Sequence, residues 1–195
     1  VDVDAWNIDA AGSCSQKCIG APPGLGPITM GPRAITTVHQ RRQPVASWYF
    51  DMNRLFQYWG EEGSTKARVF HHTAPVANLF GFREALRLIH EEDLESRFSR
   101  HQQTHDHLVN RLGEVGLALF TPETHRLPML NLIEIPDHED DAATRNALLA
   151  RGIEIAGGFG PLAGKVWRVG LMGNNATIAA VDRLVTNLAV VLERG

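Results

Sequence analysis

The sequence has few cysteines, no long apolar run and no marked excess of charge of either sign. Its two cysteines are too few for a disulfide framework and favour a reducing compartment. The sequence nowhere has eighteen consecutive apolar residues, which argues against a membrane-spanning helix. With 19 Lys and Arg against 22 Asp and Glu, the net charge of −3 gives no bulk reason to expect nucleic acid or an anionic membrane as partner.

The start of the chain also lacks familiar signals. It opens at Val1 without an initiator Met and without a basic region followed by an apolar run, so we expect a part of a longer protein without a signal peptide. The last three residues, 193–195, do not form a peroxisomal signal, and the cytoplasm is the default expectation. The 195 residues, 44% of them hydrophobic, have the composition of a globular protein that buries a sizeable core.

The periodicity of apolar residues predicts alternating strands and helices, as in an α/β or α+β protein. Asp51 is the expected N-cap of one helix, and the last helix has the clearest apolar stripe. A polar loop is expected over 60–67 and a domain boundary near 91–93. The predicted strands lie within 6–12 and at 28–30, 117–120, 129–135, 154–156 and 166–171; the predicted helices start at 32 and span 51–59, 75–90, 94–115, 140–151 and 176–193.

Lys17 is the first candidate for chemistry. It follows a short apolar strand, in a loop of small residues, and strand ends are where open α/β sheets place ligands. A lysine that loses solvation there can act as a nucleophilic amine. The alternative is an ordinary exposed lysine.

A second candidate is the run His71-His72-Thr73, which precedes a predicted long helix. Thr73 is a possible N-cap, and a helix N-terminus with a hydroxyl can bind phosphate. Capping alone, with the two histidines as packing or surface groups, is the alternative. Adjacent histidines are a poor metal signature, because on a strand they point to opposite faces.

Arg168 is the third candidate, because it lies in a mostly apolar predicted strand that follows a glycine-rich turn at 157–160. An unpaired charge there is unfavourable, and the planar guanidinium is suited to holding a carboxylate at two points. A structural ion pair with a carboxylate of the protein is the alternative.

The remaining Cys and His residues give weaker signals. Cys14 and Cys18 offer too few ligands for a metal site and are expected to be small buried side chains. His101 and His105 share one face of a predicted helix that also carries His107, and we expect a solvated face there.

Several separate motifs together resemble one known family. The run GSCSQK at 12–17, followed by APPG at 21–24, resembles the cofactor-lysine segment of class V aminotransferases, most of all the alanine–glyoxylate and serine–pyruvate aminotransferases. The resemblance continues through FQYWG at 56–60, HHTAPV at 71–76 and GGFGPLAGKVWRVGLMG at 157–173. It covers nearly the whole chain, with the motifs in order and at similar separations.

The resemblance implies an α/β protein of fold type I that uses pyridoxal 5'-phosphate. Residues 1–90 would be the C-terminal part of the large α/β/α cofactor domain, and residues 91–195 the small C-terminal α+β domain. Lys17 would be the Schiff-base lysine and would also move the proton between the substrate α-carbon and the cofactor. The family is about twice as long as this chain, so the aspartate partner of the pyridine nitrogen and the ring-stacking residue would lie in a first half.

Four further residues take roles from the same resemblance. Gln16 would contact the cofactor phosphate, and Thr73 would reach that phosphate from the neighbouring subunit of a homodimer. Arg168 would bind the substrate α-carboxylate. Phe70 stands where close relatives often have a tyrosine whose hydroxyl also contacts the phosphate, and the loss of that bond corresponds to about 1 kcal/mol of cofactor affinity.

The activity implied is a ping-pong transamination from a small amino acid, alanine or serine, to a 2-oxo acid such as glyoxylate or pyruvate, once the first half is supplied. Three alternatives remain. They are another class V activity, such as ureidoglycine–glyoxylate transamination or a lyase; a non-catalytic truncated chain that only packs against a partner; and a small metal-binding or redox protein.

Overall fold

The computed structural model describes residues 1–60 and 67–193, and the chain packs as two units. Unit 1 comprises residues 1–15 and 22–82, and unit 2 comprises residues 16–21 and 83–195. Most of the predicted polar loop at 60–67 lies outside the described residues. The proposed functional division into residues 1–90 and 91–195 stays a prediction.

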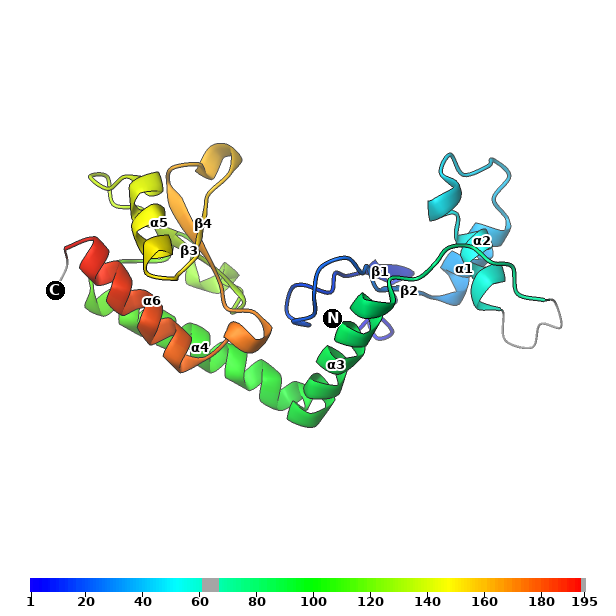
Figure 1. Ribbon diagram of the computed structural model, residues 1–195, viewed down its shortest axis with the longest axis horizontal. Helices are drawn as coiled ribbons and strands as arrows, with labels where there is room; N and C mark the ends of the chain where they lie inside the picture. The colour runs from blue at the N-terminus through cyan, green and yellow to red at the C-terminus, as the bar shows by residue number, and fades with distance from the viewer. Residues whose placement is uncertain (61–66, 194–195) are drawn as a thin grey trace. The chain divides into compact units, whose positions relative to one another are not determined.

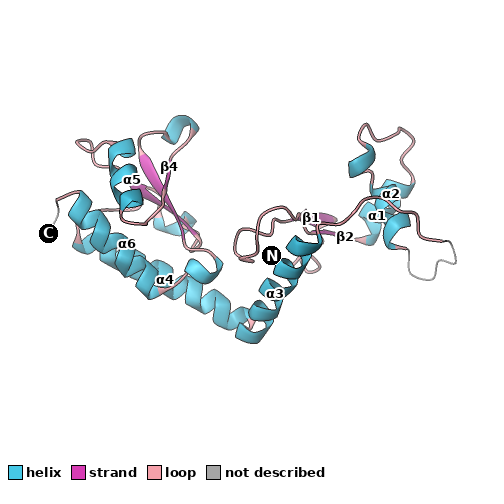
Figure 2. Ribbon diagram, in the orientation of Figure 1, coloured by secondary structure: helices cyan, strands magenta, loops and turns pink. Residues whose placement is uncertain are grey.

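Unit 1 consists of short elements joined by turns (Figures 1 and 2). Strand β1 (Ala10–Gly12) pairs antiparallel with β2 (Ile28–Met30). The helices are α1 (Pro32–His39), α2 (Met52–Trp59) and the start of α3 (Val76–Glu92), with a 3-10 turn at Trp48–Phe50. The Asp51 side chain accepts a hydrogen bond from the Asn53 amide, which confirms the predicted cap of α2.

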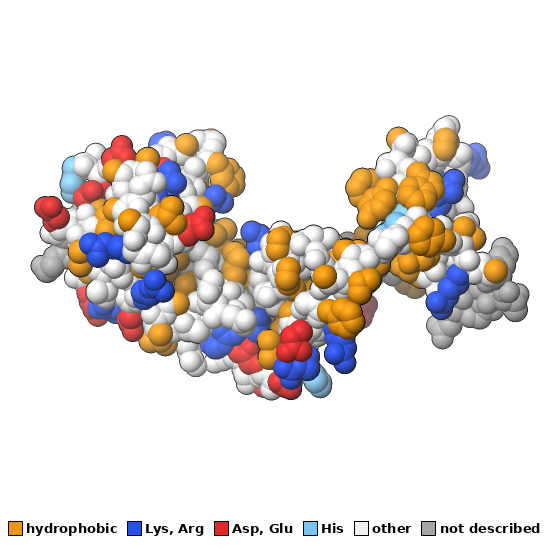
Figure 3. All heavy atoms as spheres, in the orientation of Figure 1, with side chains coloured by type: hydrophobic (Ala, Val, Ile, Leu, Met, Phe, Trp, Pro, Cys, Tyr) orange, Lys and Arg blue, Asp and Glu red, His pale blue; other side chains and the backbone are white. Residues whose placement is uncertain are grey.

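The apolar side chains of unit 1 lie mostly at its surface. Among the described residues of this unit, the only buried side chains are Ser15 and His71. The His71 ring stacks on Trp48 with ring centroids 4.1 Å apart, so this histidine packs among aromatic rings. Figure 3 shows hydrophobic side chains exposed around helices α1 and α2. The large exposed side chains include Trp6, Trp48, Tyr49, Phe50, Trp59, Phe70 and Phe80.

Unit 2 contains a three-stranded antiparallel sheet in the order β3-β5-β4, packed with three helices (Figure 1). The strands are β3 (Leu130–Glu134), β4 (Ala156–Gly157) and β5 (Val166–Gly170). The helices are α4 (Leu94–Glu114), α5 (Asp141–Ala150) and α6 (Ile178–Val191), and short 3-10 turns occur at Glu123–His125, Gly160–Leu162 and Gly173–Asn175. Helix α3 ends in this unit.

One hydrophobic core joins the sheet to these helices. Trp167 on β5 is fully buried opposite Ile133 on β3, and the α6 side chains Val181, Val185 and Leu188 are also fully buried. The apolar stripe of α6 therefore packs on the face of β5 that carries Trp167. Each of the three helices begins at a capping side chain, since Asp93, Asp140 and Thr177 accept a hydrogen bond from a backbone amide in the first turn of α4, α5 and α6.

Three predicted strands differ clearly from the structure. Of the strand predicted at 154–156, only Ala156 pairs, as part of β4. Only residues 10–12 of the predicted strand within 6–12 pair, because the chain turns before them and Asn7 adopts a left-handed conformation (φ 54°). The predicted strand at 117–120 forms a single bridge, from Leu119 to Ile133. Pro122 follows it closely and has no N–H for further pairing.

No helix in the described part of the chain combines the length and apolarity needed to cross a membrane.

Candidate functional site

Lys17 lines a pocket of about 340 Å³ within unit 2. One wall is the short segment 16–21, from which Gln16, Lys17, Gly20 and Ala21 contribute. The other wall is the end of β5 with its connection to α6, and its lining residues are Gly170, Met172, Asn174 and Asn175. Gln16 and Lys17 are both exposed. The pocket therefore does not strip water from the lysine within this chain, contrary to the expectation of lost solvation.

The backbone next to Lys17 is held by a buried arginine of α4. Arg97, 6% exposed, donates a hydrogen bond from Nη2 to the carbonyl oxygen of Cys18 at 2.7 Å. Its Nη1 donates to the Glu92 carboxylate at 2.6 Å, which fixes the guanidinium from its other side. The Gly20 amide donates to the Lys17 carbonyl at 2.9 Å, so the segment turns tightly after the lysine.

The second wall is held by the next residues of the same helix. The Gly173 amide donates to His101 Nε2 at 3.2 Å. Arg100 Nη1 donates to the carbonyls of Gly173 at 3.0 Å and Ala176 at 2.6 Å. Gly173 has a φ of +58°, and a Cβ on it would lie 3.3 Å from Gly20 Cα. Helix α4 thus ties together the two backbone segments that form the Lys17 pocket, and these glycines permit their close approach.

The expected solvated histidine face on α4 is wrong for two of its three residues. His101 and His105 are buried, 7% and 6% exposed, because each hydrogen-bonds inside unit 2. His107 is half-buried and pairs with Asp182 of α6 at 2.7 Å. The i, i+4 spacing identified the shared face of His101 and His105, but the sequence does not show what packs on that face. No signal in the sequence singled out Arg97 or Arg100.

The Glu92 carboxylate lies between the two arginines of this network and stabilises both charges. A side-chain hydrogen bond from Arg100, and then one from Arg97, lowers the pKa of the Glu92 carboxyl from 4.5 to about 2, while burial opposes the shift. Glu92 is therefore a carboxylate at neutral pH and compensates the charge of two arginines.

Arg168 lies on β5, on the strand face opposite the core. Trp167 and Val169 point into the core, so Arg168 and Gly170 share the other face, and Gly170 lines the Lys17 pocket. Arg168 Nε donates to the Gly157 carbonyl at 2.7 Å, and its guanidinium lies 4.5 Å from the centroid of the Phe159 ring. Within the described residues no carboxylate forms an ion pair with Arg168, which leaves its terminal nitrogens to bind another group.

Thr73 and Phe70 belong to unit 1, so their part in a common site with Lys17 stays a prediction. Thr73 is exposed, and it is not the N-cap of α3, because that helix begins at Val76 and Pro75 occupies the preceding position. Phe70 is 71% exposed and contacts Tyr58 edge to face, with ring centroids 6.2 Å apart.

The two cysteines are half-buried and not joined by a disulfide, rather than fully buried as expected. Within the part of the chain that the structure describes, no three His, Cys, Asp or Glu side chains are grouped so as to hold a metal ion.

Comparisons with known proteins agree on one family. The family model described as aminotransferase class-V matches residues 1–184. The alanine–glyoxylate aminotransferase of Oryctolagus cuniculus is 39% identical over 193 residues, which are 98% of this chain and 49% of that protein. The (S)-ureidoglycine–glyoxylate transaminase of Bacillus subtilis is 38% identical over 213 residues, covering 100% of this chain and 50% of that protein.

Solved structures give the same result. The alanine–glyoxylate aminotransferase of Nostoc sp. matches with a TM-score of 0.92 and 48% identity, over 98% of this chain and 50% of that one. The ureidoglycine–glyoxylate aminotransferase of Bacillus subtilis matches with a TM-score of 0.93 and 41% identity, over 100% of this chain and 49% of that one. The chain spans about half the length of the relatives it matches.

Proposed function

The chain belongs to the class V aminotransferase family, and from that premise we propose that it forms the second half of a transaminase that moves an amino group from a small amino acid, alanine or serine, to glyoxylate or pyruvate. The single observation that carries this proposal is the pocket in which Lys17 and Gln16 face the connection that follows β5. Arg168 lies two residues before the pocket residue Gly170, on the same face of β5. Two residues correspond to about 6.5 Å along a strand.

Pyridoxal phosphate is the cofactor of this family, and the residues present fit part of it. The Lys17 pocket offers a primary amine for the cofactor aldehyde, together with the side-chain amides of Gln16, Asn174 and Asn175, which donate hydrogen bonds to oxygen. Its volume of about 340 Å³ lies within the range of about 300–1,000 Å³ that is usual for small-molecule sites. We infer that Lys17 and Gln16 hold the cofactor from this chain.

When bound, pyridoxal phosphate supplies a ring that withdraws electrons and stabilises negative charge at the substrate α-carbon. Lys17 Nζ takes the proton from that carbon and later returns one. The terminal nitrogens of Arg168 bind the substrate carboxylate, while the bond from Nε to the Gly157 carbonyl fixes the orientation of the guanidinium. Gln16 donates to the cofactor phosphate, and Thr73 of a second subunit adds a hydroxyl to it.

We further propose that the chain works with a first half of the fold and as part of a homodimer. The support is the surface of unit 1, where large aromatic side chains such as Trp48, Phe50 and Phe70 are exposed. An apolar surface of this kind is typical of a region that another chain or domain covers (Figure 3).

The experiment is an assay of this chain joined to the first half of the Nostoc relative, with pyruvate formation from alanine and glyoxylate as the readout. We expect turnover that Lys17→Ala abolishes, and we expect Arg168→Met to raise the KM for both carboxylate substrates. Unchanged KM values would remove Arg168 from the substrate site. A joined protein that binds the cofactor but forms no pyruvate from alanine would exclude alanine as the donor.

Ureidoglycine is a second candidate donor, because the Bacillus subtilis relative whose name includes it matches this chain with a TM-score of 0.93. Glyoxylate becomes glycine with any of these donors, so the rate of glycine formation with alanine, serine or ureidoglycine separates the candidates by their kcat/KM values.

A further inference from the structure

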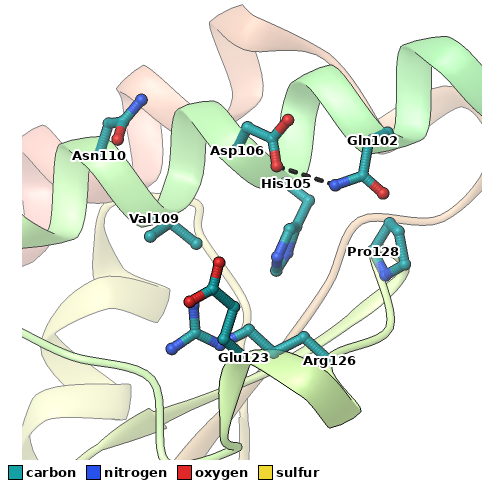
Figure 4. A pocket seen from close by; sticks show the side chains of 8 residues that line it. All are labelled: Gln102, His105, Asp106, Val109, Asn110, Glu123, Arg126 and Pro128. Atoms are coloured by element: carbon teal, nitrogen blue, oxygen red, sulfur yellow. Dashed lines mark hydrogen bonds between the residues drawn. The ribbon is translucent and has the colours of Figure 1, made fainter.

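Unit 2 contains a second pocket, of about 470 Å³, between α4 and the segment 123–128 (Figure 4). None of its lining residues is shared with the Lys17 pocket. The His105 ring projects from α4 into the space that Glu123, Arg126 and Pro128 bound from the other side. The pocket is therefore separate from the site described above and has its own set of polar groups.

His105 presents an uncommitted nitrogen to this pocket. The Asn131 side-chain nitrogen donates to the Pro128 carbonyl at 3.2 Å, which directs Asn131 Oδ1 to His105 Nδ1 at 2.7 Å. An amide oxygen only accepts, so Nδ1 carries the hydrogen and Nε2 carries the lone pair in the neutral ring. His105 is only 6% exposed, and Nε2 makes no hydrogen bond among the described residues. Among the described residues, Trp167 Nε1 is the only buried side-chain nitrogen or oxygen without a partner, so His105 Nε2 is open to the pocket and can accept a hydrogen bond from a ligand there.

The charged groups around the pocket are also uncommitted. Arg126 donates from Nε to the Thr121 carbonyl at 2.9 Å, which leaves its terminal nitrogens open. Neither Arg126 nor Glu123 forms an ion pair within residues 1–60 and 67–193, although both line this pocket. Asp106 accepts a hydrogen bond from Gln102 at 2.8 Å and adds a second carboxylate to the same lining.

These groups select the class of ligand. A simple anion would meet Arg126 but also two carboxylates, Glu123 and Asp106, and a simple amine would meet the guanidinium. A molecule with both charges meets both kinds of group: its carboxylate binds Arg126, and its ammonium donates to Glu123 and to His105 Nε2. We propose that this pocket is a second binding site, which takes a small zwitterion, an α-amino acid, independently of the Lys17 pocket.

In the test, glycine is added to the whole 195-residue chain without cofactor, and the His105 ring signals are followed by NMR. The signals of this ring are identified by their absence from the spectrum of His105→Asn. We expect the His105 ring signals to shift saturably with a Kd for glycine of about 1 mM. The affinity for glycine should fall by about tenfold or more in E123Q and in R126Q. Matched variants that remove the same charges from exposed positions elsewhere in unit 2, Glu154→Gln and Arg151→Gln, should bind glycine as the wild type does.

Two probes and two variants complete the design. Acetate and methylamine, which carry one charge each, should bind at least about tenfold more weakly than glycine. K17A and R168M should bind glycine at this pocket like the wild type. The proposal is overturned if the His105 signals do not move, if either single-charge probe matches glycine, if E123Q and R126Q bind as the wild type does, or if K17A abolishes the shifts. None of these readouts depends on transaminase activity, so failure here leaves the proposed function untouched.

Discussion

Arg97 Nη2 lies 2.7 Å from the carbonyl oxygen of Cys18, so a buried cation of helix α4 holds the backbone one residue beyond Lys17. The same guanidinium binds Glu92, and Glu92 in turn binds Arg100, which donates to the backbone of the opposite wall of the pocket. Lys17 therefore stands on a segment whose position depends on ionic contacts far from it in sequence.

Replacement of Arg97 by methionine should destabilise unit 2 by about 1.5–3 kcal/mol, the usual contribution of a hydrogen bond to a charged group. The amides of residues 17–20 should then exchange with deuterium faster than in the wild type. Urea unfolding and hydrogen exchange measure the two effects. Arg151→Met is the control, since Arg151 is exposed; equal effects of the two substitutions would remove Arg97 from its assigned role.

The acid dependence of stability should be reduced in Glu92→Gln. The folded-state pKa of Glu92, about 2, lies below its ordinary value of 4.5, so its carboxylate stabilises the fold fully above about pH 4.5 and progressively less as the pH falls towards 2. The variant should be less stable than the wild type by at most about 3 kcal/mol at about pH 6, and this gap should shrink at about pH 2.5. Urea midpoints at the two pH values test this; a gap of constant size would show that the charge of Glu92 is not the cause.

Two glycines with similar backbone conformations provide a test of the close approach beside Lys17. Gly173 and Gly164 have φ values of +58° and +71°, so alanine at either should cost about 1–2 kcal/mol from the left-handed conformation alone. A Cβ at Gly164 meets open space, whereas one at Gly173 would lie 3.3 Å from Gly20 Cα. We expect Gly173→Ala to cost about 1–3 kcal/mol more than Gly164→Ala in thermal unfolding. Equal costs would mean that the two walls of the pocket are not tightly packed there.

The order of the elements in unit 2 was predictable because its helices carry strong signals. The apolar stripe of α6 marks a helix that the structure confirms, and Thr177 caps its first turn. The predictions of secondary structure fail where a neighbouring part of the chain changes what the local sequence favours. Residues 117–120 have the apolar character of a strand, but Pro122 limits their pairing. Helix α3 begins at Val76, three residues after Thr73, so the Thr73 hydroxyl does not cap it.

The residues with candidate chemical roles were predictable from the sequence, but the side chains that hold them in place were not. Lys17 and Arg168 were identifiable because an isolated lysine among small residues and an arginine in an apolar strand are unusual. Arg97 and His101 look in the sequence like members of a polar helix face. Their importance comes from contacts with residues 18 and 173, separated from them by more than seventy positions, and no local pattern encodes such contacts.

Lys17 is the residue that we propose binds the cofactor, and covalent labelling tests this assignment. The chain, joined to the first half of a relative, is incubated with pyridoxal phosphate, reduced with borohydride to fix the lysine–cofactor linkage as a secondary amine, and digested for mass analysis. The sequence contains three lysines, Lys17, Lys66 and Lys165, so the label can be assigned without ambiguity. We expect the added mass on the peptide that contains Lys17 and its loss in Lys17→Ala; label on Lys66 or Lys165 in its place, or no label at all, would contradict this assignment.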